Sequence, residues 1–433
     1  MKTILKNATL LPEYGFAGKN VHVTVEDKRI TAIDEQLPEL TGAEVVDCKG
    51  NLLIPAFYNA HCHAAMTLFR GYGEDLPLQR WLEERIFPAE ELLTHKSVYS
   101  ATKWAIAEML RGGVVSFSDM YMFEDAVAEA VLETGIKANL SRSLVSFDPS
   151  VDPSKDFRIA EALELCKNYH NADDGRLKID MSLHAEYTNQ PHYCAYVGEL
   201  AASLGVGMQL HLSETEKEHN DCIARHGKTP TEFFDSLGVF NAPTTAAHCV
   251  WVSDSDLEIM AKKGVTAAHN PISNLKLGSG VMPLKKMLNA GVNVALGTDG
   301  VASNNRLDLL REMQTAAILH KGISRDPAIT VAADMIALAT KNGAMAQQRT
   351  DCGKVEVGYR ADLVLIDRNA VHNIPSYDDY AMLAYSAERQ DVIFTMADGR
   401  ILYRNGEYTL IDEERLRFEC REVFAHYFDQ TVS

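Results

Sequence analysis

Residues 52–63 read LLIPAFYNAHCH, an apolar run that ends in two histidines. A short, continuous apolar run of this kind is typical of a parallel strand that is buried on both faces. The same pattern recurs along the chain, and further apolar runs lead into His211-Leu212-Ser213-Glu214, Ala247-His248-Cys249 and Gly297-Thr298-Asp299-Gly300. Because the parallel strands of a closed barrel all end on one face, we expect these distant groups to converge there.

The middle of the chain alternates such runs with helical patterns, for example at residues 98–111 and 256–263. This alternation is typical of βα units. Eight strands within about 250 residues match the usual size of a (β/α)8 barrel. The expected strands lie at residues 52–59, 114–119, 138–144, 178–183, 207–212, 244–247, 265–268 and 292–297.

Both ends of the chain show a different pattern, in which apolar and polar residues alternate. Residues 21–25 (VHVTV) are one example, and the same texture returns after Gly353. A period of two indicates strands with one buried face. The predicted fold is therefore α/β: a (β/α)8 TIM barrel at residues 54–353, carrying a small β-sandwich domain built from residues 1–53 and 354–433.

The composition narrows the class of protein. A chain of 433 residues with 46% apolar content is long enough for one large core and a smaller second one. A formal net charge of −18 argues against nucleic acids and anionic membrane surfaces as partners. No stretch approaches the ~20 apolar residues of a membrane span, and the first residues lack a signal-peptide core. Eight scattered cysteines without a CxxC pair favour reduced thiols and a cytoplasmic location.

Four of the residues at the strand ends have the chemistry of metal ligands. His61 and His63 are two positions apart, so a strand places both side chains on one face. On its own, such a pair more often represents two core or hydrogen-bonded histidines than a metal site. Together with His211 and Asp299 at the ends of other strands, it predicts a divalent metal site with an open position for water.

Two further side chains lie where they could take part in catalysis. Glu214 follows the ligand His211, where apolar surroundings would raise its pKa and suit it to moving protons; a surface glutamate is the alternative. His248 could bind a second metal or donate a hydrogen bond to the attacking water. Barrel hydrolases with two metals generally have a bridging lysine at the end of strand four. His184 holds that position here, which favours one metal and a His248 that is not a ligand.

Longer stretches resemble the S-adenosylhomocysteine and 5'-methylthioadenosine deaminase family of the amidohydrolase superfamily, a relative of the triazine chlorohydrolases. These stretches lie at residues 61–71, 81–82, 246–250, 270–278 and 296–305. The resemblance implies hydrolytic deamination at C6 of an adenine nucleoside, with one divalent metal per chain, expected to be zinc. It implies that Asp299 accepts a proton from water, that Glu214 protonates ring N1 and that His248 stabilises the tetrahedral adduct.

The same resemblance implies a set of substrate contacts. Trp81 lies in one of the matching stretches, and Glu90 corresponds to the family's ribose-binding glutamate. Arg142 and Arg158 correspond to arginines that bind a carboxylate on the 5' tail. His184 corresponds to the histidine used on the purine. Together these residues favour S-adenosylhomocysteine, 5'-methylthioadenosine or both, and leave the preferred 5' substituent open.

Two other functions have to be weighed against this one. The first keeps the metal but acts on another amino- or chloro-substituted heterocycle, such as a triazine, guanine or a pterin; the ribose and carboxylate residues argue against it. The second is a barrel relative that has lost catalysis, against which the intact ligand set and Glu214 argue. The expected partner is a small nucleoside, with no nucleic acid or membrane, and the sequence leaves open whether the protein is a homo-oligomer.

Overall fold

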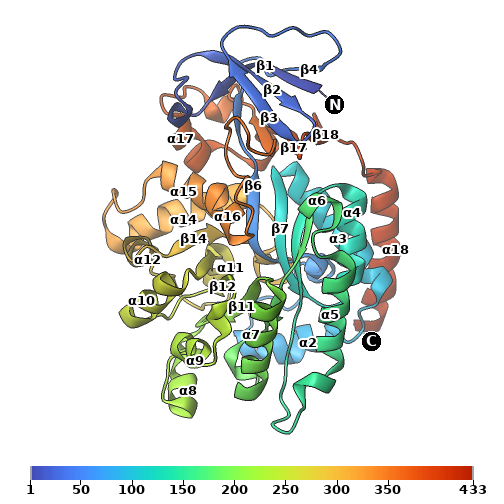
Figure 1. Ribbon diagram of the computed structural model, residues 1–433, viewed down its shortest axis with the longest axis vertical. Coiled ribbons are helices and arrows are strands. Elements are labelled where there is room, and N and C mark those ends of the chain that lie inside the picture. The colour runs from blue at the N-terminus through green and yellow to red at the C-terminus, as the bar shows by residue number, and fades with distance from the viewer. Residues whose placement is uncertain (1, 432–433) are drawn as a thin grey trace.

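The computed structural model describes residues 2–431, so Met1 and residues 432–433 of the predicted terminal domain lie outside the described residues. A nine-stranded sheet lies at one end of the molecule, next to the part that holds the parallel strands (Figure 1). Its strand order is β19-β18-β17-β16-β5-β1-β2-β3, with β4 paired to β1. The bounds are β1 (Lys2–Leu10), β2 (Asn20–Glu26), β3 (Arg29–Asp34), β4 (Glu44–Asp47), β5 (Leu52–Pro55), β16 (Leu363–Ile366), β17 (Val392–Ala397), β18 (Arg400–Arg404) and β19 (Glu407–Tyr408).

This sheet joins the two ends of the chain. Strand β5 pairs in parallel with β1 and antiparallel with β16, so strands from both ends share one hydrogen-bonded layer. The expected sandwich of two layers is not confirmed, since the described strands form a single sheet with β4 as a branch. The strands of this sheet contribute a small core of buried apolar side chains, among them Leu5, Val23, Leu363 and Phe394.

The remaining strands are parallel and form two sheets of five. Their orders are β15-β6-β7-β8-β9 and β10-β11-β12-β13-β14. The bounds are β6 (Phe57–His63), β7 (Val114–Tyr121), β8 (Lys137–Arg142), β9 (Leu177–Ile179), β10 (Met181–Leu183), β11 (Met208–Leu212), β12 (Thr244–His248), β13 (Thr266–His269), β14 (Asn293–Leu296) and β15 (Asp299–Gly300).

The prediction of an α/β fold with parallel strands is confirmed, but a closed barrel is not seen in the strand pairing. The predicted strand at 178–183 is divided at Asp180, whose buried carboxylate accepts hydrogen bonds from Asn139 (3.1 Å) and Gln209 (3.0 Å). The predicted strand at 292–297 is followed by a break and then by β15, which pairs with β6. The predicted strand at 52–59 is also two strands, because Ala56 separates β5 from β6.

Helices follow most of the parallel strands, as the alternating pattern predicted. They are α1 (Leu78–Trp81), α2 (Phe87–Glu90), α3 (His95–Arg111), α4 (Glu124–Thr134), α5 (Phe157–Tyr169), α6 (Ala172–Gly175), α7 (Pro191–Leu204), α8 (Glu216–His226), α9 (Pro230–Ser236), α10 (Asp254–Lys263), α11 (Pro271–Lys276), α12 (Leu284–Asn289), α13 (Val301–Asn304), α14 (Leu309–Ser324), α15 (Ala332–Ala339), α16 (Lys341–Ala346), α17 (Asp379–Ala381) and α18 (Glu413–Thr431).

Capping residues explain where the predicted helices begin. Helix α3 starts before the predicted residue 98 because Thr94 accepts a hydrogen bond from the backbone N–H of Ser97 at 3.2 Å. Helix α10 likewise starts before residue 256, because Ser253 caps the N–H of Asp256 at 3.1 Å. Such caps satisfy donors that the first helical turn leaves without a partner.

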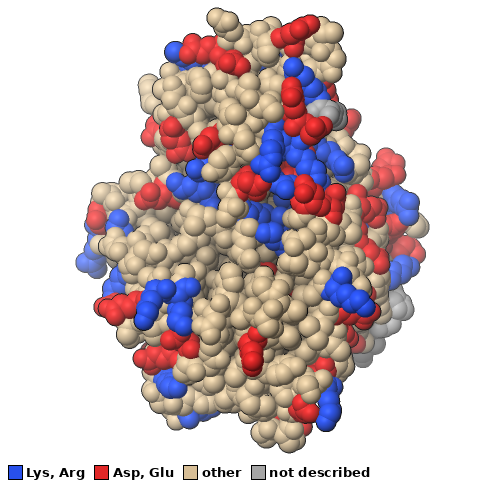
Figure 2. All heavy atoms as spheres, viewed as in Figure 1, with Lys and Arg blue, Asp and Glu red and all other residues tan. Residues whose placement is uncertain are grey.

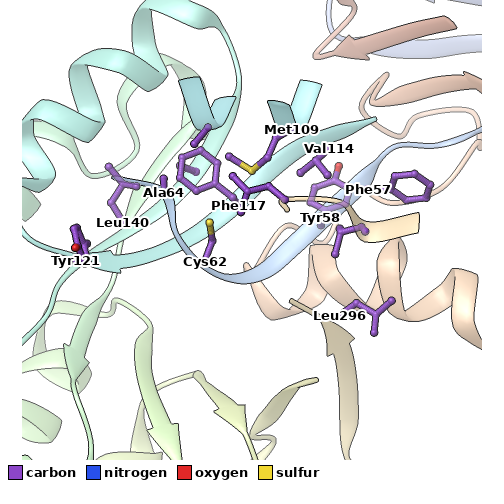
Figure 3. Packing of buried hydrophobic residues seen from close by; sticks show 14 of the residues in the cluster. Phe57, Tyr58, Cys62, Ala64, Met109, Val114, Phe117, Tyr121, Leu140 and Leu296 are labelled. Atoms are coloured by element: carbon purple, nitrogen blue, oxygen red, sulfur yellow. The ribbon is translucent and has the colours of Figure 1, made fainter. Parts of the chain in front are cut away.

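The main core lies between the parallel strands and their helices. Figure 3 shows Phe57, Val114 and Phe117 from the strands together with Met109 from α3. These side chains are fully buried. Strand side chains that are buried on both faces explain the continuous apolar runs in the sequence.

A buried group of charged residues links the parallel strands to the terminal sheet. Lys137, at the start of β8, lies 2.8 Å from Asp398 and also contacts Asp362, which in turn accepts a hydrogen bond from Tyr58. The side chains of Lys137, Asp362 and Asp398 are at most 1% exposed. Burial alone would raise the pKa of Asp398, but Lys137 holds it below its usual value.

The charged side chains of the surface carry both signs. On the face shown in Figure 2, acidic and basic side chains are interspersed. Ion pairs such as Lys28 with Asp174 (2.9 Å) join side chains of opposite sign. Within residues 2–431, no helix combines the length and the apolar character that crossing a membrane requires.

Candidate active site

The histidines that end the parallel strands meet at one point. His61 and His63 come from β6 and His211 from β11, and one ring nitrogen of each lies within 4.8 Å of the others. Asp299 in β15 joins them, with Oδ1 3.2 Å from Nε2 of His63 and 3.6 Å from Nε2 of His61. The structure therefore brings together all four predicted ligands, and all four are buried.

The hydrogen bonds of these rings show that the group is suited to a cation. Nδ1 of His63 lies 2.8 Å from the carbonyl oxygen of Met120, and Nδ1 of His211 lies 2.8 Å from that of His184. A carbonyl only accepts, so each Nδ1 carries the proton and each Nε2 presents a lone pair. These two Nε2 atoms face each other at 3.4 Å. Lone pairs this close repel, and a divalent metal between them turns the repulsion into ligation.

His61 and Asp299 complete the set of donor atoms. Nε2 of His61 is buried and has no hydrogen-bond partner in the described part of the chain. Asp299 is held by Ser273 (2.6 Å) and Ser303 (2.9 Å) at one oxygen and by the N–H of Gly300 (2.8 Å) at the other. A fixed carboxylate beside an unpartnered imidazole nitrogen is the donor set that a divalent zinc ion takes in proteins.

Glu214 lies beside this group and faces His248. One carboxylate oxygen accepts a hydrogen bond from Ser279 at 3.0 Å, and the other lies 3.8 Å from Nε2 of His248. Burial raises the pKa of Glu214, which keeps a proton available closer to neutral pH. The turn that carries Glu214 is fixed by Glu218, whose carboxylate accepts from the backbone N–H groups of Ser213 (2.9 Å) and Glu214 (2.7 Å).

His248 lies at the edge of the same group. Its Nδ1 is 2.8 Å from the side-chain oxygen of Asn274, which fixes the ring. A ring nitrogen of His248 lies within 4.8 Å of ligand atoms of His61 and Asp299. His248 has a positive φ of 72°, and Asp299 has one of 60°. Strained backbone of this kind is concentrated at functional sites, where the surrounding structure holds it in place.

A cavity of about 280 Å³ opens above these residues. All five predicted substrate contacts line it, namely Trp81, Glu90, Arg142, Arg158 and His184. His63, His211, Glu214, His248 and Asp299 line it as well, whereas His61 is not among the lining residues. One cavity thus contains every predicted catalytic and substrate-binding residue.

The predicted purine and ribose contacts are already positioned by the protein. The carboxylate of Glu90 accepts a hydrogen bond from the hydroxyl of Tyr121 at 2.6 Å, and burial raises the pKa of Glu90 to about 7. The ring of His184 stands edge-on to that of His211, with centroids 4.8 Å apart. Burial lowers the pKa of His184 to about 4, so its ring is neutral at neutral pH.

Both predicted tail-binding arginines are paired with carboxylates. Nε of Arg142 lies 2.8 Å from Glu161, and Nη1 of Arg158 lies 3.0 Å from Asp156. Nη1 of Arg142 also donates to the carbonyl oxygen of Ser143 at 2.8 Å. The arginines are therefore held in place, and part of their charge is balanced before any ligand arrives.

Several supporting residues were not predicted from the sequence. Ser279, Asn274, Tyr121 and Glu161 act through contacts between elements that are distant in the chain, so no local pattern marks them. Glu218 does have a signal, because Thr215 followed three positions later by a glutamate has the form of a helix capping box. Its carboxylate reaches back to Ser213 and Glu214.

The chain is similar to known proteins over most of its length. A sequence model of the amidohydrolase family matches residues 52–402. A 5-methylthioadenosine/S-adenosylhomocysteine deaminase from Dictyoglomus thermophilum is 44% identical over 378 residues, which is 87% of this chain and 88% of that protein. A 5'-deoxyadenosine deaminase from Methanosarcina mazei is 41% identical over 97% of each chain.

The chain is also similar in fold to solved structures. The crystal structure of an adenosine deaminase from Xanthomonas campestris with bound zinc superposes with a TM-score of 0.91 at 33% identity, covering 99% of this chain and 98% of that one. The atrazine chlorohydrolase of Arthrobacter aurescens complexed with zinc has a TM-score of 0.90 at 21% identity, with 98% and 100% coverage. At that identity the second likeness concerns the fold alone.

Proposed function

The chain belongs to the amidohydrolase family, and we propose that it is a metal-dependent hydrolytic deaminase acting at C6 of adenine nucleosides, with S-adenosylhomocysteine and 5'-methylthioadenosine as substrates. The observation that carries this proposal is the shared cavity, which is lined by three of the four predicted metal ligands, a buried glutamate and the predicted nucleoside contacts. The deaminase names of full-length relatives at about 40% identity support it.

The proposed metal is one divalent ion per chain, zinc by preference, held by His61, His63, His211 and Asp299. When bound, such an ion lowers the pKa of a water molecule toward about 7. The carbonyl groups of Met120 and His184 support the proposal, because they fix the protonation of two of the ligand rings.

The chain's own residues carry the proton transfers. We assign to Glu214 the protonation of ring N1, which makes C6 electrophilic, and its raised pKa suits that role. Asp299 accepts the proton of the attacking water and returns it to the amino group, which leaves C6 as ammonia. His248, oriented by Asn274, stabilises the charge that develops on the tetrahedral adduct. Trp81, Glu90 and His184 position the nucleoside, and Arg142 and Arg158 bind the carboxylate of a tail.

The closed barrel, the domain bounds, the location and the partners of the protein are part of the same proposal. We infer that the two parallel sheets act as one (β/α)8 barrel, since only Asp180 separates β9 from β10 and only two residues separate β14 from β15. The domain bounds, 54–353 for the barrel and 1–53 with 354–433 for the terminal β-sandwich domain, remain predictions. So do the cytoplasmic location and the absence of nucleic-acid partners.

Elemental analysis of the purified protein tests the metal assignment. We expect one equivalent of a divalent metal per chain, and we expect that a chelator removes both metal and activity until zinc is restored. His63→Ala should lower the metal content, whereas His95→Ala, an exposed histidine on α3, should not. Two equivalents that are both required for activity would contradict a single-metal site and make His248 a ligand.

Ammonia release from a panel of compounds, with chloride release measured for the chlorotriazines, tests the proposed reaction. We expect turnover of S-adenosylhomocysteine, 5'-methylthioadenosine and adenosine, and no significant turnover of guanine or of amino- and chlorotriazines. The nucleosides share the ribose that Glu90 is proposed to bind, and the other heterocycles lack it. Preferential turnover of a triazine or of guanine would refute the proposed function.

Arg142→Ala tests how the tail is recognised. Charge-assisted hydrogen bonds contribute about 1.5–3 kcal/mol each, so we expect kcat/KM for S-adenosylhomocysteine to fall by about 10–150-fold. Nucleosides without a carboxylate should be unaffected. Glu90→Ala serves as the comparison, because it should harm all nucleosides alike. Equal losses on adenosine and S-adenosylhomocysteine in the Arg142 variant would make this arginine structural.

A further inference from the structure

A second cavity shares part of its lining with the substrate cavity. This neighbour has a volume of about 740 Å³ and shares Glu90, Met122 and Arg142 with the first. Its far wall is formed by residues of α5, among them Glu161 and Glu164. Arg142 therefore stands at the junction, where the end of a 5' substituent on a bound nucleoside would arrive.

The second cavity is strongly acidic. Its carboxylates come from Glu90, Glu91, Glu124, Asp125, Glu161 and Glu164. The basic side chains that line it are Arg142 and His95, and His95 lies 3.6 Å from Asp125. Negative charge exceeds positive charge in this space, so a cation entering it is attracted.

Two of these carboxyl groups add less charge than the others. Burial raises the pKa of Glu90 to about 7 and that of Glu124 well above its usual value. The surplus of negative charge therefore comes mainly from Glu91, Asp125, Glu161 and Glu164.

Arg142 and Glu161 form an ion pair at the junction, so opposite charges lie side by side there. Arg142 uses Nε for Glu161 and one Nη1 hydrogen for Ser143, and three of the five guanidinium N–H groups remain for a ligand. Glu161 is 53% exposed at its side chain, so its carboxylate is accessible from the second cavity. An amino-acid group carries an ammonium and a carboxylate on one carbon, which is the matching arrangement of charges.

We propose that Glu161 is a specificity-determining residue that binds the ammonium group of a 5' tail while Arg142 binds the tail's carboxylate. This inference rests on the proposed function and adds to it that the enzyme selects a zwitterionic amino-acid tail over a tail that carries a carboxylate alone. The acidic cavity beyond the junction supplies the surplus negative charge that favours the ammonium.

Three nucleosides that differ only in the tail test the inference. Each is a 5'-thioether of adenosine, with a methyl, a 3-aminopropyl or a 3-carboxypropyl group on sulfur. Removing one charge-assisted hydrogen bond costs about 1.5 kcal/mol or more. For Glu161→Gln we therefore expect kcat/KM on the aminopropyl compound to fall by about tenfold, because KM rises. The value of kcat/KM for the methyl compound should be unaffected, and the value for the carboxypropyl compound should rise.

Glu164→Gln is the matched control. It removes a carboxylate from the same helix and the same cavity, but no ion pair joins Glu164 to Arg142 among the described residues. We expect this variant to treat all three compounds as the wild type does. A loss on the aminopropyl compound equal to that of Glu161→Gln would overturn the special role of Glu161.

Other outcomes separate the inference from the function on which it rests. If Glu161→Gln harms the carboxypropyl compound and spares the aminopropyl one, Glu161 only positions Arg142, and the inference is wrong. Equal losses on all three compounds would give it a structural role and overturn the inference as well. If the wild type deaminates none of the three, the proposed function itself fails, and the inference fails with it.

Discussion

Replacing Glu214 with glutamine lowers kcat on 5'-methylthioadenosine by about 10²–10⁴-fold, the usual contribution of a positioned acid or base. The amide keeps the size of the side chain and its contact with the hydroxyl of Ser279. It cannot carry the proton that ring N1 requires. Metal content and the unfolding transition should stay at wild-type values, so the loss is one of chemistry. Steady-state kinetics, elemental analysis and thermal unfolding measure the three quantities.

Glu216→Gln provides the control for this experiment. Glu216 is exposed in the first turn of α8, two positions from Glu214. Its replacement alters the local charge by the same amount and should leave kcat unchanged. Turnover of the Glu214 variant close to that of the wild type would remove Glu214 from the mechanism and leave the source of the N1 proton to another group.

Replacing Lys137 with methionine lowers the free energy of unfolding by about 3–5 kcal/mol, the cost of breaking a buried ion pair at one partner. The methionine leaves Asp362 and Asp398 buried without their ammonium partner. Arg360 still lies 3.1 Å from Asp398, but Asp362 then retains only polar contacts such as the hydroxyl of Tyr58. Urea unfolding followed by circular dichroism measures the change.

Lys286→Met gives the matching surface measurement. Lys286 pairs with Asp254 at 2.8 Å, and both side chains are more than two-thirds exposed. Exposed pairs contribute about 0–1 kcal/mol, so this variant should unfold almost as the wild type does. If the two variants lose stability equally, the buried group at Lys137 contributes no more than a surface ion pair.

The sequence predicted much of the fold because buried parallel strands leave a local signal. The runs at residues 114–119 and 207–212 lie within β7 and close to β11, and α3 and α10 were found from their periodicity. The division at Asp180 was not predictable, since it depends on Asn139 and Gln209 in neighbouring strands. Sheet pairing is a contact between distant residues, and no local pattern encodes it.

The candidate site, too, was predictable only where local patterns mark its residues. The sequence placed His61, His63, His211 and Asp299 at strand ends, and the common direction of parallel strands then implied that they meet. The pairing of Arg142 with Glu161 could not be foreseen, because it joins the end of β8 to the middle of α5. That pairing alters the charge a tail encounters, so the chemistry of recognition depended on the structure. The roles of these residues remain predictions.

The pairing of β5 also bears on how a newly made chain folds. Strand β5 lies between β1, which the ribosome releases before it, and β16, which follows only after all the parallel strands. Until β16 is synthesised, one edge of the apolar strand β5 has no neighbour, and such edges promote association with other chains. Pro55 removes one backbone donor at the end of this strand, which weakens unwanted pairing. Completion of the terminal sheet is therefore a late step of folding.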